Sequence, residues 1–347
     1  MRFTHDTLAQ RVRFATGDAA AAVAEEAGLL GIRRAMVVAT PRGAGVARAV
    51  TAGIDVAVLH EGVREHVPVE VADAARAVAA EDDVDGIICV GGGSATGLAK
   101  VVALTSGVPV LAVPTTYAGS EATDIWGLTS AGTKTTGTDP RVLPRTVVYD
   151  ASLTLDLPVP LSVTSGLNAL AHAVDALWAP RADPINAALA GEGARALAES
   201  LPAVVDVPRD EAAREQVLHG TYLASVAFAS AGSGLHHKIC HVLGGRFDLP
   251  HAATHAVVLP HVLALNAPHA PEAEQRLAAA LGSRSAVAGL RELYDRLDAP
   301  RTLRGLGLRE DQLAEAATAI LPAVPPSNPA AVSRAVLLDL LGAAWGP

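Results

Sequence analysis

The first 150 residues alternate short apolar runs with alanine-rich segments that have a helical period. Uninterrupted apolar runs predict strands buried on both faces, as in a parallel sheet. Expected strands cover residues 11–14, 35–39, 56–59, 86–90 and 108–113, and expected helices cover 17–27, 44–52, 69–80 and a segment from about residue 95. Strands and helices alternating at this spacing predict an α/β domain with a mostly parallel sheet covered on both faces.

The pattern changes near Asp150. Beyond Pro158 and Pro160, strand-like runs give way to long segments rich in alanine and leucine with helical spacing. Expected helices cover residues 161–178, 184–203, 210–230, 236–243 and 251–264, with shorter ones as far as residue 345. A chain of 347 residues is long enough for two cores. We therefore expect an α/β domain at 1–155 and an all-helical domain at 156–347.

Composition excludes some classes of protein. The net charge is −9, and no run of five basic residues occurs, which argues against nucleic acid or an anionic membrane as a partner. The N-terminal residues lack the apolar stretch of a signal peptide, and no run of eighteen apolar residues predicts a membrane span. Cys89 and Cys240 are far apart in sequence, so reduced thiols and a cytoplasmic location are expected.

A glycine-rich turn follows the expected strand at 86–90. Gly91, Gly92, Gly93 and Ser94 open the next helix, whose N-terminal amides favour negative charge. This arrangement suits a pyrophosphate, although Thr96 stands where the dinucleotide fingerprint has its third glycine. A glycine turn after a strand also occurs for purely structural reasons.

A second polar loop follows the expected strand at 108–113. Thr115, Thr116 and Ser120 offer hydroxyl groups there, although Ser120 is equally suited to capping the following helix. Two such loops at the carboxyl ends of neighbouring parallel strands form the usual ligand crevice of these sheets. Together they predict a nucleotide site.

Histidines are concentrated in the helical half, at positions 236, 237, 241 and 251. His237 and His241 are four residues apart and share a helix face, and Asn168 and His172 have the same spacing. Gly244-Gly245 is expected to end the first helix, so that His251 folds back over it. Such a set is typical of a metal or proton-transfer site between helices. The alternative is that these histidines only hydrogen-bond to backbone.

These motifs together resemble the iron-containing alcohol dehydrogenase family, over nearly the whole chain. The resemblance rests on Gly-Gly-Gly-Ser, on Pro-Thr-Thr-x-x-Gly-Ser-Glu, and on the histidine spacing with proline before the last histidine. It implies two domains, with the cofactor in the cleft between them. The family's four metal-ligand positions correspond to Asn168, His172, His237 and His251. Metal-dependent members have aspartate at the first position, so Asn168 implies that no metal is required.

Within this family, the segments around Asn168, Gly234 and Pro250 resemble the maleylacetate reductase branch. That resemblance implies reduction of 2-maleylacetate, a small dicarboxylate, to 3-oxoadipate by NADH or NADPH, and a homodimer. Arg42 follows the second strand with no carboxylate nearby, which favours use of both cofactors.

The reaction adds hydride to the alkene carbon β to the ketone and leaves an enolate to be protonated. We expect His241 or His251 to polarise the enolate or donate the proton, and His237 and His172 to orient them. Lys238 is expected to bind a substrate carboxylate, and the alternative is that it is a surface charge. Arg246 either binds a carboxylate of the substrate or is a surface charge. His255 and His261 are expected to have structural roles.

Three other functions share parts of this pattern. A metal-dependent alcohol or glycerol dehydrogenase would use the same residues to hold Fe²⁺ or Zn²⁺, but Asn168 disfavours it. A dehydroquinate synthase-like lyase also requires a carboxylate ligand at that position. A non-catalytic nucleotide sensor does not require so many histidines.

Overall fold

The structure is a computed structural model that describes residues 1–130 and 133–346. Its internal contacts divide the chain into two compact units, Leu8–Leu157 and Pro158–Pro347, and the second unit also includes Met1–Thr7. The division lies close to the boundary expected after residue 155. The N-terminal segment differs from expectation, because it belongs with the helical unit and not with the α/β unit.

The α/β unit is built on a six-stranded sheet in the order β1-β8-β5-β4-β2-β3. All of its pairs are parallel, which confirms the expected sheet. Its strands are β1 (Arg11–Phe14), β2 (Ala35–Val38), β3 (Val56–His60), β4 (Gly86–Gly91), β5 (Val110–Pro114) and β8 (Thr146–Tyr149). The central strands are buried throughout, and this explains why they consist almost entirely of apolar residues.

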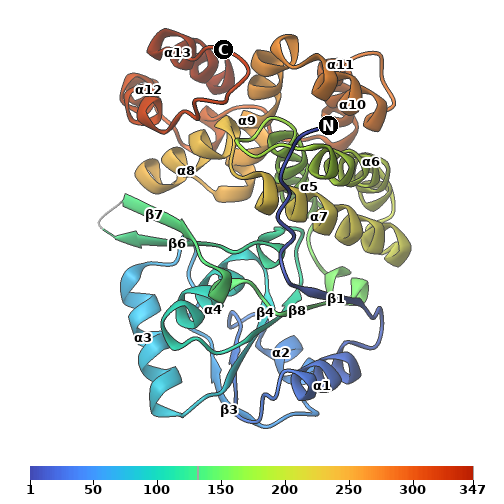
Figure 1. The fold of residues 1–347 in the computed structure, drawn as a ribbon, viewed down its shortest axis with the longest axis vertical. Coiled ribbons are helices and arrows are strands. Elements are labelled where there is room, and N and C mark those ends of the chain that lie inside the picture. The colour runs from blue at the N-terminus through green and yellow to red at the C-terminus, as the bar shows by residue number, and fades with distance from the viewer. Residues whose placement is uncertain (131–132, 347) are drawn as a thin grey trace. The chain divides into compact units, whose positions relative to one another are not determined.

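Helices cover both faces of this sheet (Figure 1). One face packs against α1 (Ala19–Leu29) and α2 (Ala44–Val50) in a core of alanine, valine, leucine and isoleucine. The other face carries α3 (Val69–Glu81) and α4 (Gly93–Ser106), which contact each other, and α4 packs directly against β2, β4 and β5. The many alanines let these helices approach the sheet closely, and this accounts for the alanine-rich pattern in the sequence.

Two further strands, β6 (Ile125–Ser130) and β7 (Thr133–Thr138), form an antiparallel pair outside the main sheet. The sequence did not predict them, nor did it predict β8. Strands β6 and β7 are rich in threonine and partly exposed, so they lack the continuous apolar run used to recognise strands.

Every element between residues 158 and 346, all of which the structure describes, is a helix, as expected. The α-helices are α5 (Val159–Ala176), α6 (Pro184–Asp206), α7 (Glu211–Ala231), α8 (Leu235–Phe247), α9 (His251–Asn266), α10 (Pro271–Ala280), α11 (Ala286–Leu297), α12 (Leu313–Ile320) and α13 (Arg334–Trp345). Helix α5 is the central one and packs against α6, α7 and α9. Its residues from Ser165 to Ala176 are all buried, and this stretch carries Asn168 and His172.

Helix α8 does not end at Gly244-Gly245, as the sequence suggested, but continues to Phe247. Glycine inside a helix costs about 1 kcal/mol relative to alanine. That cost is offset here because Leu243 is fully buried and Phe247 packs against the core shared with α9, α12 and α13. The helix ends instead at Asp248, which has a left-handed backbone with φ 54°.

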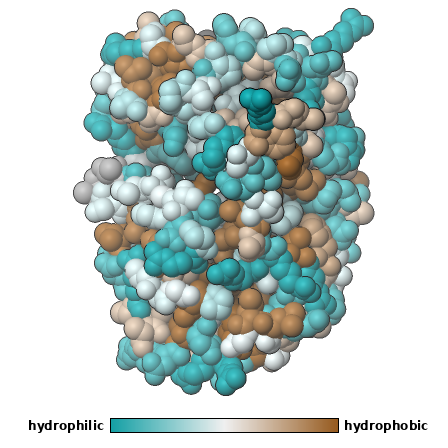
Figure 2. All heavy atoms as spheres, viewed as in Figure 1, coloured by the Kyte–Doolittle hydropathy of each residue, from teal (hydrophilic) through white to brown (hydrophobic). Residues whose placement is uncertain are grey.

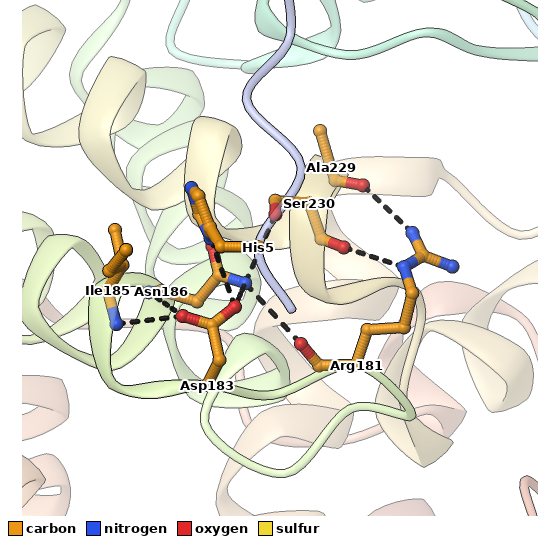
Figure 3. A network of polar contacts seen from close by, with 7 residues as sticks. All are labelled: His5, Arg181, Asp183, Ile185, Asn186, Ala229 and Ser230. Atoms are coloured by element: carbon orange, nitrogen blue, oxygen red, sulfur yellow. Dashed lines mark hydrogen bonds and ion pairs between the residues drawn. The ribbon is translucent and has the colours of Figure 1, made fainter. Parts of the chain in front are cut away.

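A polar network holds the N-terminal segment to the helical unit (Figure 3). His5 Nδ1 lies 3.0 Å from Asp183 Oδ2, and Asp183 also caps α6 by accepting from two of its first amides. Asn186 Nδ2 donates to both Asp183 and Ser230, so α6 is tied to the end of α7. Arg181 donates to the carbonyl of Ser230. These contacts explain why the first residues do not belong to the α/β unit.

No helix in the part of the chain that the structure describes is long and apolar enough to cross a membrane. On the face shown in Figure 2, hydrophilic residues separate the hydrophobic ones into small patches. The large exposed apolar side chains, such as Leu29 and Val207, come from separate elements. Single exposed apolar residues of this kind are normal in globular proteins.

Replacing Asp183 tests this network. We expect Asp183→Ala to lower the free energy of unfolding by about 1–3 kcal/mol, because it removes a helix cap and leaves polar partners buried. His5→Ala is the matched control and should cost less, since it leaves the cap intact. Urea unfolding followed by circular dichroism measures both. An Asp183→Ala protein as stable as the wild type would contradict the structural role of this network.

Candidate functional site

The glycine turn between β4 and α4 has the backbone that a phosphate site requires. Gly91 has φ +150°, a conformation that residues with side chains rarely adopt. A Cβ atom on Gly92 would lie 2.9 Å from Thr116 Cγ2, so only glycine lets the two loops approach this closely. Helix α4 has no side-chain cap at its N-terminus. Its first amides and its dipole therefore favour an anion at this end.

The second loop lies directly beside this turn. Strands β4 and β5 are neighbours, and the Thr115 amide donates to the Gly91 carbonyl at 3.0 Å. Thr115, Thr116 and Ser120 are half-buried, and Ser120 does not cap the turn that it begins, where Gly119 is the cap residue. Arg42 is exposed after β2, the strand on the other side of β4. The two loops thus lie side by side at the carboxyl ends of β4 and β5, where the sequence predicts a nucleotide site.

A fully buried lysine fixes the second loop, a role that the sequence analysis missed. Lys100 Nζ donates to the carbonyls of Ser120, Thr123 and Ile125 at 2.6, 2.7 and 2.9 Å. Burial lowers the pKa of Lys100 to about 7, although the nearby carboxyl group of Glu121 acts in the opposite direction. The four oxygens around Nζ, including Thr123 Oγ1 at 2.9 Å, favour the ammonium form. The sequence did contain a sign of this role, because Lys100 stands among apolar residues of a buried helix, where a lysine needs oxygen partners.

In the helical unit, the buried carboxylate of Asp175 organises the start of α8. Asp175 Oδ2 accepts from the amides of Gly234 and His237, both at 3.1 Å, and from His237 Nδ1 at 2.7 Å. A Cβ atom on Gly234 would lie 2.4 Å from Asp175 Oδ1, so glycine is required beside the carboxylate. The contact places the His237 proton on Nδ1 and leaves the lone pair on Nε2. Asp175 was not among the residues that the sequence singled out.

His172 and His237 lie against each other in the interior. Their rings stack with centroids 4.9 Å apart, and Phe228 packs against both at 4.7 and 4.2 Å. His172 Nδ1 lies 2.9 Å from Ser225 Oγ on α7, which fixes the plane of its ring. Both histidines are almost fully buried. The structure thus brings together residues from three helices, as expected for orienting groups.

His241 and His251 are only half-buried, in contrast to His237. Their rings are nearly parallel, with centroids 6.4 Å apart, and His241 lies 6.1 Å from His237. These two imidazoles are thus the more exposed members of the cluster. Lys238 is also half-buried on α8. Arg246 is exposed and paired with Glu315 at 2.6 Å, so it is a surface charge.

Two further histidines complete the cluster from inside. His236 and His255 are fully buried, and His236 Nε2 donates to the carbonyl of His255 at 3.0 Å. The His255 ring lies 4.8 Å from that of His237 and 4.3 Å from that of His251. Burial lowers the pKa of both His236 and His255, and that of His255 falls well below its usual value. His255, expected to be structural, is therefore a neutral member at the centre of the cluster.

The histidines that lie close enough together to share an ion only partly overlap with the family's metal-ligand positions. Within residues 1–130 and 133–346, one group of three histidine, cysteine or acidic residues has its ligand atoms within 4.8 Å of one another. That group is His236, His237 and His255, and it excludes His172 and His251. Asn168 adds only a neutral amide, a weaker donor than a carboxylate. The four family positions thus lack a carboxylate, because Asn168 stands at the first of them.

Comparisons with known proteins agree with this architecture. A family model described as "Iron-containing alcohol dehydrogenase" matches residues 9–151, and one described as "Fe-containing alcohol dehydrogenase family, C-terminal" matches residues 162–345. A maleylacetate reductase from Sphingobium indicum is 47% identical over 346 residues, which cover 99% of this chain and 97% of that protein.

Solved structures agree as well. The crystal structure of a maleylacetate reductase from Agrobacterium tumefaciens has a TM-score of 0.93 and 43% identity, over 99% of this chain and 98% of that one. An iron-containing alcohol dehydrogenase from Corynebacterium glutamicum has a TM-score of 0.97 and 53% identity, over 99% and 97%. The chain belongs to the iron-containing alcohol dehydrogenase family, and full-length relatives within that family are maleylacetate reductases.

Proposed function

We propose that this protein is a maleylacetate reductase, which reduces the C=C bond of 2-maleylacetate to give 3-oxoadipate with NADH or NADPH. The observation that carries the proposal is full-length identity of 42–47% to several maleylacetate reductases. The histidine cluster supports this function, because the half-buried imidazoles of His241 and His251 lie beside buried histidines whose orientation is fixed. When bound, the nicotinamide supplies the hydride.

The histidines divide by burial into two groups with different work. His241 and His251 are half-buried and accessible, so one of them polarises the ketone oxygen or protonates the α-carbon. His237 and His172 are buried and hold their positions by contacts with Asp175 and Ser225. His237 thus acts as an orienting group with a fixed tautomer. Lys238, beside it on α8, is the group that we assign to a substrate carboxylate.

The cofactor-binding role falls to the α/β unit. Gly91, Gly92, Gly93 and Ser94 surround the N-terminus of α4, and Thr115, Thr116 and Ser120 line the adjacent loop. No carboxylate follows β2 to reject a 2′-phosphate, and Arg42 is exposed there. We therefore propose that both NADH and NADPH are used. A homodimer and a cytoplasmic location complete the proposal by analogy with the family.

A metal-dependent alcohol or glycerol dehydrogenase is the alternative. That activity polarises a localised alkoxide with an ion held at the family's ligand positions. Asn168 disfavours it, because the first ligand position then offers a neutral amide in place of a carboxylate. The enolate of maleylacetate is delocalised, so hydrogen bonds from imidazoles suffice to stabilise it.

The reaction itself is the first test. Purified protein should oxidise NADH when maleylacetate is added, which is followed as a fall in absorbance at the NADH band. Ethanol, glycerol and propanediol with NAD⁺ should give little activity, because no metal polarises the alkoxide. Strong alcohol oxidation together with no enone reduction would sink the proposed function.

Replacement of His241 tests the division of work among the histidines. We expect His241→Ala to lower kcat by about 10²–10⁴-fold, the range for loss of a general acid. His261→Ala is a matched control, because His261 lies on α9 with its pKa lowered by partial burial but outside the cluster. Steady-state kinetics on both folded variants make the comparison. Near-normal kcat for His241→Ala would move the proton-donor role to another residue.

Removal of metal tests the role of Asn168. Activity with maleylacetate should be unchanged after exhaustive treatment with EDTA, because the family's ion has no suitable ligand set here. The measurement is the rate of NADH oxidation before and after chelation, with and without added Fe²⁺ or Zn²⁺. Loss of activity that either ion restores would return the protein to the metal-dependent branch.

A further inference from the structure

Three buried histidines, His236, His237 and His255, lie close together and form a set that differs from the family's four ligand positions. His236 and His237 begin α8, and His255 lies one turn into α9. One ring nitrogen from each lies within 4.8 Å of the other two. The rings of His236 and His255 are 4.9 Å apart, and those of His237 and His255 are 4.8 Å apart. Only His237 belongs to both this set and the family's set.

The hydrogen bonds of two of these histidines have the pattern typical of metal ligands. A metal-binding histidine usually donates its second ring N–H to a carboxylate or a backbone carbonyl. His237 Nδ1 donates to Asp175 Oδ2 at 2.7 Å, and His236 Nε2 donates to the His255 carbonyl at 3.0 Å. The lone pairs are thus on His237 Nε2 and on His236 Nδ1, and the latter atom also lies 3.5 Å from His237 Nδ1. Both rings are already fixed in orientation and tautomer.

The third histidine lacks partners for its ring. His255 is 0% exposed, and neither Nδ1 nor Nε2 has a hydrogen-bond partner in the described structure. An unsatisfied buried polar group costs about 1–3 kcal/mol. A neutral imidazole keeps a lone pair on one of its two ring nitrogens. A coordinated ion would satisfy that nitrogen.

We propose that His236, His237 and His255 form a site for one divalent transition metal of the Zn²⁺ or Co²⁺ type. Three neutral imidazoles suit these ions, whereas Mg²⁺ and Ca²⁺ prefer oxygen ligands. Zn–N bonds of about 2.0–2.1 Å require the three ring nitrogens to move closer together when the ion binds. The site shares His237 with the family's ligand set, but its other two ligands, His236 and His255, are outside that set, and it does not include the half-buried pair His241 and His251.

This site is not required for the proposed reduction, so its test is a binding measurement. EDTA-treated full-length protein is incubated with CoCl₂, desalted and analysed for cobalt content and visible absorption. We expect one Co²⁺ per chain with the intense visible band of a low-coordinate ion, which Zn²⁺ displaces. Saturation should also raise the thermal unfolding temperature, because the ion binds the folded state.

Variants decide which histidines are ligands. His255→Leu and His236→Leu should weaken Co²⁺ binding by at least about 100-fold, and Asp175→Asn by about 10–100-fold as an outer-sphere partner. His172→Ala and His251→Ala, at family ligand positions, are the matched controls and should bind Co²⁺ normally. Circular dichroism without metal checks folding, and His255→Asn replaces His255→Leu where the latter does not fold.

Three results would overturn the proposal. The first is no stoichiometric Co²⁺ on the wild-type chain. The second is binding that His172→Ala or His251→Ala abolishes but His255→Leu does not, which would assign the ion to the family position. The third is equal binding by all variants, as for adventitious surface sites. None of these depends on maleylacetate, so failure here is distinguishable from failure of the proposed reductase activity.

Discussion

The helical unit depends on one buried carboxylate. Asp175 has no solvent exposure, and burial raises its pKa, with His236 and the backbone amides of α8 acting in the opposite direction. By accepting from Gly234 and His237 it sets where α8 begins and which ring nitrogen of His237 carries the proton. An isolated charge in this position would be costly, so the carboxylate and the α8 N-terminus must form together. The contact of Asp175 with the start of α8 thus sets the position of His237, against which the other histidines of the cluster pack.

Much of the fold followed from residue pattern alone. The strands β2, β4 and β5 are short, continuous apolar runs, and the alanine-rich helices around them have a helical period. The change to all-helical structure near Pro158 was equally clear. The glycine turn at Gly91 and the histidines of α5, α8 and α9 also stood out, since their residue types are unusual at those positions.

The remaining features depend on contacts between residues that are far apart in the sequence, which the pattern of a short segment does not reveal. Strands β6 and β7 pair with each other and lack a buried face, so no apolar run marked them. Helix α8 passes through Gly244 because packing against distant helices outweighs local propensity. Asp175 and Lys100 gained their roles only from partners far along the chain or across a loop. His5 likewise joined the helical unit through Asp183, which lies 178 residues away.

The Lys100 contacts bear on how tightly a dinucleotide can be held. Because the ammonium group binds three carbonyls of the segment from Ser120 to Ile125, that loop has its shape without any ligand. A loop that is already ordered loses little conformational entropy when it closes on a bound molecule. More of the contact energy then appears as affinity, and the rigid loop distinguishes ligands by shape instead of adapting to each one. If the loop binds the cofactor as proposed, Lys100 contributes to that binding without contacting the ligand, because its ammonium group only holds the loop in shape.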